Sequence, residues 1–198
     1  MPIFQFTGLS GSGKTTLAEA VAELLIEKQL EVEIIDGDVY RKTLCADLSF
    51  SRADREENIR RLGLVAKQFD QQNKIVLIAA INPFESVRKE LTMNYNAKVI
   101  WLQCDLDTLV KRDTKGLYRK AYLPEGHPEK LHGLTGVSDL YEEPENADLV
   151  VNTGLTTIAF CAQQIVTLVY QPTPTQKIEF MEEKCGSQLS TFDKKQYL

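Results

Sequence analysis

The chain has 198 residues, of which 43% are hydrophobic and 26% are charged. This composition is typical of a globular protein and excludes fibrous and largely disordered chains, and the length predicts one domain because domains average about 150 residues. The formal net charge of −5 argues against a protein that coats duplex nucleic acid, because such proteins bind phosphates through many lysines and arginines. We therefore expect no nucleic-acid partner.

Short apolar segments alternate with segments of helical period along residues 1–170. The apolar segments predict five strands, at Ile3–Thr7, Glu31–Asp36, Lys74–Ala80, Lys98–Gln103 and Asp148–Asn152. The segments between and after them predict helices at Gly13–Lys28, Ala53–Gln72, Pro83–Met93, Leu106–Arg112 and Leu155–Tyr170. This alternation is typical of an α/β fold with a five-stranded parallel sheet flanked by helices. We expect residues 1–170 to form this single domain.

Two segments depart from the alternation. Residues 113–146 contain both histidines of the chain and form a connection longer than usual. Because the neighbouring residues 111–120 are rich in lysine and arginine, we expect a functional loop there rather than disorder. Residues 171–198 form a tail that we expect to be either a docked arm or partly disordered.

Neither the cysteines nor the apolar segments suggest a membrane or metal protein. The cysteines lie far apart, at Cys45, Cys104, Cys161 and Cys185, so no zinc or redox motif is present and we expect reduced thiols. The longest apolar run, Ile75–Ile81, is shorter than the roughly 20 residues of a membrane span. The N-terminus lacks a basic region followed by an apolar signal segment. We expect a cytoplasmic enzyme with no membrane partner.

A phosphate-binding motif lies between the first predicted strand and the first predicted helix. Residues 8–15 read GLSGSGKT, which matches the P-loop pattern G-x-x-x-x-G-K-[ST]. In this pattern the glycine-rich backbone surrounds phosphates, the lysine contacts the β- and γ-phosphates, and the hydroxyl that follows binds Mg²⁺. The sequence therefore predicts an ATP and Mg²⁺ site. The residues expected to bind the nucleotide are Gly8, Ser10, Gly11, Ser12, Gly13, Lys14, Thr15 and Thr16.

Two aspartates follow the second predicted strand, at Asp36 and Asp38. The carboxyl ends of the strands are the edge where open α/β sheets bind ligands. Asp38 is a candidate base that accepts the proton of an attacking hydroxyl, and Asp36 is a candidate to hold Mg²⁺ through water or to brace Asp38. A pair of solvated turn residues is the alternative. No Asn-Lys-x-Asp guanine-binding segment follows, which favours ATP over GTP.

The second predicted helix carries a possible anion site. Arg55 and Asn58 are three residues apart and share one face of the helix. The arginine fork suits phosphate or sulfate, and the asparagine amide adds hydrogen-bonding specificity. For Arg60 and Arg61 we expect only ion pairs on a solvated helix face, such as Glu56 with Arg60.

Several motifs together resemble the adenylylsulfate kinase family over about residues 3–152. In chain order they are Gly8–Thr16, Asp36–Asp38, Phe50-Ser51, Asp54-Arg55, Asn58–Arg61, Arg112–Ala121, Thr135-Gly136, Tyr141-Glu142 and Pro144. The first motif is shared by many enzymes, whereas the arginine-asparagine segment and Lys115–Tyr118 are much more specific.

The resemblance implies a P-loop kinase that transfers the γ-phosphate of MgATP to the 3′-hydroxyl of adenosine 5′-phosphosulfate (APS). It implies Lys14, Asp38 and Lys115 as catalytic residues, with Asp38 as the base and Lys115 on a mobile lid at about 113–146. Arg112 would join the nucleotide site, and Thr15 and Asp36 would hold Mg²⁺. The residues implied to bind APS are Arg41, Phe50, Arg55, Asn58, Ile81, Asn82, Lys115 and Leu134. The resemblance also suggests a homodimer.

Two positions depart from the family pattern. Leu134 stands where the family has a phenylalanine that stacks on the adenine of APS, and Asn82 stands where it usually has a serine before a proline. If leucine replaces the aromatic ring poorly, the affinity for the acceptor falls by roughly 5- to 150-fold, because base stacking contributes about 1–3 kcal/mol.

Two further readings of the sequence are open. The first is a P-loop kinase for another small anionic alcohol, with a pocket altered at Leu134 and Asn82. The second is a module that binds ATP without turnover. Asp38 and Lys115 argue against such a sensor, because it needs neither a base nor a lid cation.

Overall fold

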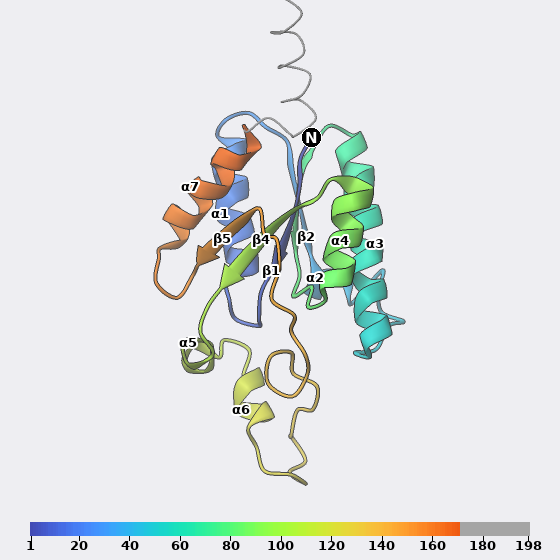
Figure 1. Cartoon of the computed structure of the whole chain (residues 1–198), viewed down its shortest axis with the longest axis vertical. Coiled ribbons are helices and arrows are strands. Elements are labelled where there is room, and N and C mark those ends of the chain that lie inside the picture. Colours follow the sequence, from blue (N-terminus) through green and yellow to red (C-terminus); the bar gives the residue numbers. More distant parts are fainter. Residues whose placement is uncertain (171–198) are drawn as a thin grey trace, which may run out of the picture. The chain divides into compact units, whose positions relative to one another are not determined.

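Five parallel strands form the centre of the fold in the order β2-β3-β1-β4-β5 (Figure 1). The strands are β1 (Ile3–Thr7), β2 (Val32–Asp36), β3 (Ile75–Ala79), β4 (Lys98–Gln103) and β5 (Leu149–Asn152). The structure, a computed structural model, describes residues 1–170, of which Met1–Val166 form one compact unit. The predicted fold class and all five predicted strands are confirmed. The predicted tail at 171–198 lies outside the described residues.

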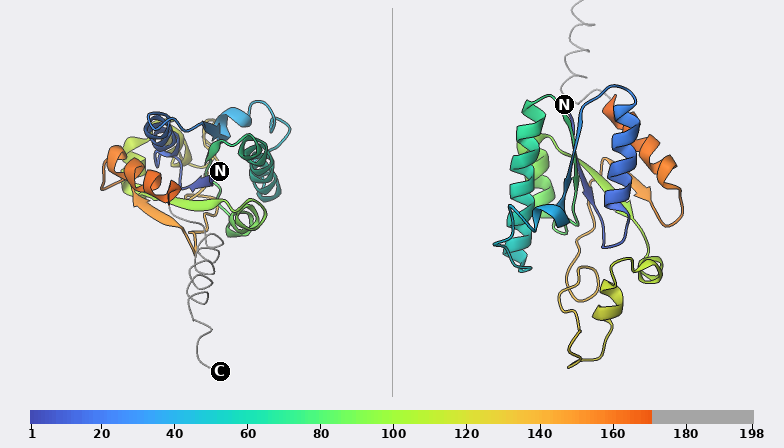
Figure 2. Two further views of the ribbon diagram at one scale, coloured as in Figure 1. Left: turned by 90° about the horizontal axis from the view of Figure 1, so that it is seen from above. Right: turned by 180° about the vertical axis from the view of Figure 1, so that it is seen from behind.

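Helices cover both faces of the sheet (Figures 1 and 2). On one face lie α1 (Lys14–Ile26) and α7 (Ile158–Val169), whose residues up to Val166 belong to this unit. On the other face lie α3 (Arg52–Gln71) and α4 (Glu85–Tyr95). Three short helices are α2 (Gly37–Tyr40), α5 (Leu106–Arg112) and α6 (Leu117–Ala121). The five predicted helices occur with ends shifted by a few residues at most, whereas α2 and α6 escaped prediction because one turn carries too little apolar period.

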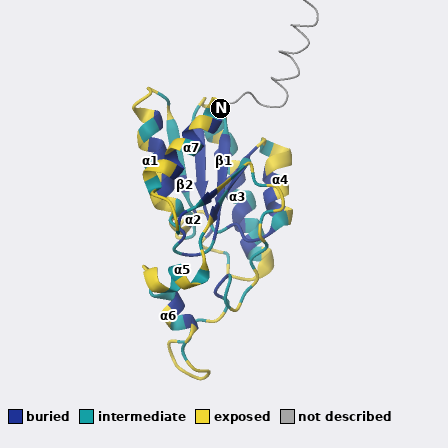
Figure 3. Cartoon of the chain, turned by 60° about the vertical axis from the view of Figure 1, so that its left-hand side comes forward, coloured by how far each residue is buried: buried dark blue, intermediate teal, exposed yellow. Residues whose placement is uncertain are grey.

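Buried residues gather in the central strands, which Figure 3 draws in the colour of buried residues between the helices. Every residue of β1 and β3 is buried, because strands covered on both faces meet no solvent and are therefore nearly continuous apolar runs. α3 and α4 approach each other closely at Gly63. A Cβ atom there would lie 2.9 Å from the Tyr95 ring and 3.2 Å from Leu91, so the absence of a side chain permits this contact.

The structure bears on membrane spans, metal sites and the state of the cysteines. Among residues 1–170, no helix combines the length and the apolar character needed to cross a bilayer. Within the same residues, no group of three or more histidine, cysteine, aspartate or glutamate side chains is placed to hold a metal ion. Cys45, Cys104 and Cys161 are free thiols, and Cys185 lies outside the described residues.

Candidate active site

A cavity of about 770 Å³ lies at the carboxyl ends of the strands, where open α/β sheets bind ligands. Its walls come from the loop before α1, the ends of β2 and β3, the segment with α5 and α6, and the start of α7. Figure 1 shows α5 and α6 beyond the ends of the strands. The predicted site residues that line the cavity are Ser10, Gly11, Gly13, Lys14, Thr15, Thr16, Asp36, Asp38, Phe50, Arg55, Ile81, Arg112, Lys115 and Leu134.

The loop before α1 has the backbone of a phosphate-binding turn. Gly11 and Gly13 have φ angles of 77° and 87°, in the left-handed region that glycine adopts readily. At Gly8 a Cβ atom would lie 2.7 Å from the main-chain oxygen of Leu102, so only glycine fits beside β4. No side chain caps α1 at Gly13, which leaves the first N–H groups of the helix directed at the loop. A helix N-terminus with free N–H groups favours an anion.

Lys14 is folded back onto this loop. Its ammonium group donates hydrogen bonds to the main-chain oxygens of Gly8 (2.9 Å) and Leu9 (2.8 Å). Desolvation of this enclosed group and the nearby charge of Lys115 lower the pKa of Lys14 to about 7. An anion among the loop N–H groups would favour the charged form of Lys14 and raise this pKa.

Thr15 and Asp36 form the oxygen-rich part of the site. The Thr15 hydroxyl donates a 2.7 Å hydrogen bond to the Asp36 carboxylate. The same carboxylate caps α2 by accepting the N–H groups of Asp38 (2.8 Å) and Val39 (3.2 Å). Hydroxyl and carboxylate oxygens are the ligands that Mg²⁺ prefers. The two residues predicted to hold Mg²⁺ are therefore adjacent, and their chemistry fits this ion.

Asp38 and Lys115 face each other across the cavity. They form an ion pair between the end of β2 and the predicted lid, although 77 positions separate them in the chain. Both side chains stay more than half exposed, at 69% for Asp38 and 54% for Lys115. An exposed ion pair contributes little to stability, so each group is free to exchange its partner for a ligand.

Phe50 forms a wall on the α3 side of the cavity. Its side chain is among the exposed large hydrophobic groups, with 66% of its surface accessible. The guanidinium carbon of Arg41 lies 4.6 Å from the ring centroid, which is within the range of a cation–π contact. Arg41 also donates a 2.8 Å hydrogen bond to the main-chain oxygen of Ser49. An exposed ring with a cation beside it suits the stacking of a base.

Arg55 joins Phe50 to the far end of the lid. Its Nε atom donates to the main-chain oxygen of Phe50 at 2.8 Å. Its terminal nitrogens donate to the Thr135 hydroxyl (3.0 Å) and the Gly133 main-chain oxygen (2.8 Å), and they pair with Asp139 at 3.0 Å. The side chain is 9% exposed. Arg55 thus holds two walls of the cavity at a fixed separation.

Comparison with known proteins agrees with this geometry. Residues 2–152 match the adenylylsulphate kinase family. The chain belongs to the adenylylsulphate kinase family. It is 46% identical to the adenylyl-sulfate kinase of Prochlorococcus marinus over 168 residues, which cover 83% of this chain and 81% of that protein. The resemblance drawn from the sequence motifs is therefore confirmed.

Solved structures agree with this assignment to the family. A Mycobacterium tuberculosis APS kinase, solved in complex with AMPPNP and APS, has a TM-score of 0.78 and 34% identity, covering 86% of this chain and all of that one, 100%. A hexameric APS kinase from Thiobacillus denitrificans has a TM-score of 0.60 and 29% identity, covering 83% of this chain and 28% of that one.

The two departures from the family pattern have structural settings. Leu134 lines the cavity but is 6% exposed, and it packs in a lid cluster with Leu109, Tyr118 and Ala121. Asn82 is 3% exposed and has a φ angle of 45°, a left-handed conformation that asparagine tolerates better than most residues. Its amide donates to Gln5 at 3.0 Å, so Asn82 is bound to β1.

Some predicted site residues do not line the cavity. Within the described part of the chain, these are Gly8, Ser12, Arg41, Asn58 and Asn82. Gly8 lets the loop pass close to β4, and Arg41 packs on the ring of Phe50, which does line the cavity. Asn58 is buried, and its side-chain oxygen has no hydrogen-bond partner among the described residues. A buried acceptor without a donor is unfavourable. A ligand that donated a hydrogen bond to the Asn58 oxygen would therefore remove this cost.

The structure shows contacts of Tyr118 and Arg112 that the sequence motifs did not specify, and it adds lining residues that those motifs missed. Tyr118 of α6 is buried, and its hydroxyl donates a 2.8 Å hydrogen bond to the main-chain oxygen of Ser10, which ties the lid to the phosphate loop. Arg112 donates to the main-chain oxygen of Thr153 at 2.7 Å. Four further lining residues follow β5 or begin α7, namely Thr153, Thr156, Thr157 and Ile158. Their position after a parallel strand was the signal that could have found them.

Proposed function

We propose that this chain transfers the γ-phosphate of ATP to the 3′-hydroxyl of adenosine 5′-phosphosulfate, giving 3′-phosphoadenosine 5′-phosphosulfate and ADP. One observation carries the assignment of roles. Asp38 and Lys115 meet across a cavity that also contains Lys14 and the phosphate loop. The candidate base, the candidate lid cation and the phosphate loop thus line one cavity in a chain that belongs to the adenylylsulphate kinase family.

The loop side of the cavity binds the nucleotide in this proposal. The main-chain N–H groups of the loop and the start of α1 bind the phosphates. Lys14 leaves the carbonyls of Gly8 and Leu9 for the β- and γ-phosphates. Mg²⁺, when bound beside Thr15 and Asp36, neutralises developing charge on the phosphates. Arg112 and the residues after β5 lie together in the cavity wall, and in this proposal they contact the rest of the nucleotide.

The transfer step uses Asp38 and Lys115 in this proposal. Asp38 accepts the proton of the 3′-hydroxyl, the hydroxyl oxygen bonds to the γ-phosphorus, and the bond from that phosphorus to the bridging oxygen breaks to release ADP. Lys115 stabilises the γ-oxygens while charge spreads over them. The ion pair between Asp38 and Lys115 supports these roles, because it brings the two side chains together at the cavity.

The acceptor binds between Phe50 and the lid in this proposal. Phe50 stacks on the adenine ring, with Leu134 as an aliphatic opposite wall. Arg55 fixes the distance between these walls. Ile81 lines the acceptor side, and Arg41 contacts the Phe50 ring. Asn58 offers an acceptor oxygen without a partner among the described residues, and Asn82 holds the turn after β3 through Gln5.

An acceptor screen tests the proposed function. ADP release is measured with MgATP alone and with APS, nucleoside monophosphates or small sugar acids. Release confined to APS is expected. Activity only with another acceptor would support a retuned pocket at Leu134, and nucleotide binding without release in any mixture would support a sensor.

The homodimer and the cytoplasmic location stay predictions. A similar chain is described as hexameric, so we propose the dimer on the family resemblance alone. The mass of the protein in solution, measured by sedimentation, tests it directly.

A further inference from the structure

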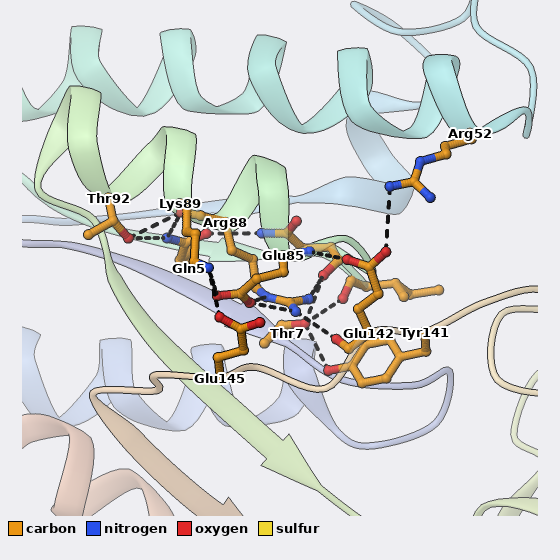
Figure 4. A network of polar contacts seen from close by, with 12 residues as sticks. Gln5, Thr7, Arg52, Glu85, Arg88, Lys89, Thr92, Tyr141, Glu142 and Glu145 are labelled. Atoms are coloured by element: carbon orange, nitrogen blue, oxygen red, sulfur yellow. Dashed lines mark hydrogen bonds and ion pairs between the residues drawn. The ribbon is translucent and has the colours of Figure 1, made fainter.

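Arg88, on α4, is the buried centre of a network of polar contacts (Figure 4). It is 1% exposed. Its guanidinium group donates hydrogen bonds to the main-chain oxygens of Asn82 (2.8 Å) and Glu142 (2.6 Å) and to the carboxylate of Glu85 (2.9 Å). Asn82 directly follows Ile81, a residue of the cavity wall. One side chain therefore joins α4, the turn after β3 and the far end of the lid.

Glu142 is bound to the start of α4 through both its main chain and its side chain. Its N–H group donates to the main-chain oxygen of Pro83 at 2.9 Å. Its carboxylate accepts the N–H group of Glu85 at 2.8 Å and lies 3.5 Å from the guanidinium group of Arg52. Figure 4 shows these contacts converging on Glu142. The end of the lid is thus fixed at several points.

Tyr141 links the same end of the lid to the start of the phosphate loop. Its hydroxyl lies 2.9 Å from the hydroxyl of Thr7, which also contacts the main-chain oxygens of Ile81 (2.8 Å) and Asn82 (3.0 Å). The Ile81 oxygen in turn accepts the N–H group of Gly8 at 3.3 Å. Desolvation raises the pKa of Tyr141 to about 12, so it remains protonated at neutral pH.

The other end of the lid is tied to the phosphate loop through Tyr118, but it includes left-handed and exposed positions. Asp113 and Gly116 have φ angles of 23° and 65°, and Arg112 beside them is exposed. Every residue of the lid tip from 124 to 129 is exposed as well. The end at Tyr141 and Glu142 contrasts with these segments because its partners Thr7, Asn82 and Arg88 are all buried.

We propose that Arg88 is a positioning residue for phosphate transfer, which holds the Tyr141–Glu142 end of the lid and the Ile81–Asn82 turn in one fixed arrangement. The lid then closes about this end and excludes water from the γ-phosphate. When the arrangement loosens, water reaches the γ-phosphorus, bonds to it as the bond to the bridging oxygen breaks, and yields phosphate and ADP. The inference rests on the proposed function.

The test compares two rates in each variant, ADP release without acceptor and ADP release with saturating APS. Arg88→Lys keeps the charge but loses the fork of donors, and Tyr141→Phe removes only the hydroxyl that meets Thr7. Glu90→Gln is the matched control, because Glu90 lies on the same helix and pairs with Arg60 at 2.7 Å on a different surface. A smaller folded fraction lowers both rates equally, so their ratio reports lid position rather than stability.

We expect the ratio of hydrolysis to transfer to rise about tenfold in Arg88→Lys, since misplacement by about 1 Å slows transfer strongly. A smaller rise is expected in Tyr141→Phe and none in Glu90→Gln. If Arg88→Lys does not fold, the ratio of hydrolysis to transfer in Tyr141→Phe and Glu142→Gln tests the inference. An unchanged ratio in the folded variants overturns the inference. Wild-type protein that releases no ADP with APS would instead overturn the proposed function.

Discussion

Lys115 at the start of the lid pairs with Asp38 at the end of β2, so the two residues expected to act on the γ-phosphate already touch. Both residues line the cavity, and both lie close enough to Lys14 to affect its pKa. Because both groups are largely exposed, breaking the pair costs little. The contact therefore does not lock residues 113–146 in place, which is compatible with the predicted mobile lid.

Asp38→Asn tests the catalytic base. Asparagine keeps the size of the side chain but cannot take a proton, so we expect turnover with APS to fall about 10²-fold or more. The affinity for MgADP is expected to stay nearly unchanged, because Lys14 and the loop N–H groups bind the phosphates. Turnover and nucleotide affinity are measured on the same preparation. Unchanged turnover would remove Asp38 from the mechanism.

The pKa of Lys14 gives the nucleotide site a predictable pH dependence. This pKa is about 7 in the free protein, and bound phosphates raise it because they favour the charged ammonium. Binding above pH 7 therefore takes up a proton, so affinity for MgADP is expected to fall as pH rises above 7, by at most about tenfold per pH unit.

Calorimetry in two buffers of different ionisation enthalpy measures this proton uptake directly. At pH 8 we expect uptake approaching one proton in the wild type. Lys14→Arg serves as the comparison, because arginine stays charged across this range and should bind MgADP without uptake. Equal proton uptake in both proteins would contradict the assignment to Lys14.

Much of the nucleotide side could be predicted from the sequence because its parts are local. The loop at 8–15 fixes its own backbone and precedes α1 directly, and Asp36 and Asp38 follow β2. The parallel order of the strands then brings these two segments together at one edge. Residue type and spacing were therefore sufficient to predict the nucleotide side of the cavity.

The acceptor side was less predictable because its contacts join distant segments. Arg55 was expected to contact an anion, but its hydrogen bonds reach residues 78 and 80 positions away. Asn82 was expected near the acceptor, and its amide instead bonds to Gln5 on β1, 77 positions away. The network around Arg88 likewise depends on where the lid returns to α4, which no local pattern specifies.

Arg55→Lys tests the connection between the two acceptor walls. Lysine cannot bridge Phe50, Gly133 and Thr135 at once, and each hydrogen bond from a charged donor contributes about 1.5–3 kcal/mol. We expect the KM for APS to rise about tenfold or more while the affinity for MgADP is kept. Steady-state kinetics with each substrate varied separates these effects.

Arg60→Lys is the matched control for this experiment. Arg60 lies on the same helix, and it pairs with Glu56 as predicted and also with Glu90, with its side chain 39% exposed. Such exposed pairs contribute about 0–1 kcal/mol, so its kinetics should match those of the wild type. Equal changes in both variants would show that the effect comes from α3 in general rather than from Arg55.

Leu134→Phe tests the aliphatic wall of the acceptor site. The side chain lines the cavity and also packs in the lid cluster with Leu109, Tyr118 and Ala121. A phenylalanine overpacks this cluster and should destabilise the protein by about 1–3 kcal/mol. The same strain is present with and without ligand, so it cancels from the binding equilibrium. The gain from aromatic stacking does not cancel, and the affinity for APS is expected to rise by roughly 5- to 150-fold.

Val137→Phe separates these two effects of the larger ring. Val137 packs against the same lid cluster but is not among the described residues that line the cavity. Its variant should therefore lose thermal stability without any gain in affinity for APS. Thermal unfolding and calorimetric titration of both variants measure the two quantities independently. A Leu134→Phe protein that binds APS more weakly than the wild type would mean that the base does not lie against this wall, and the acceptor would then have to bind Phe50 from another direction.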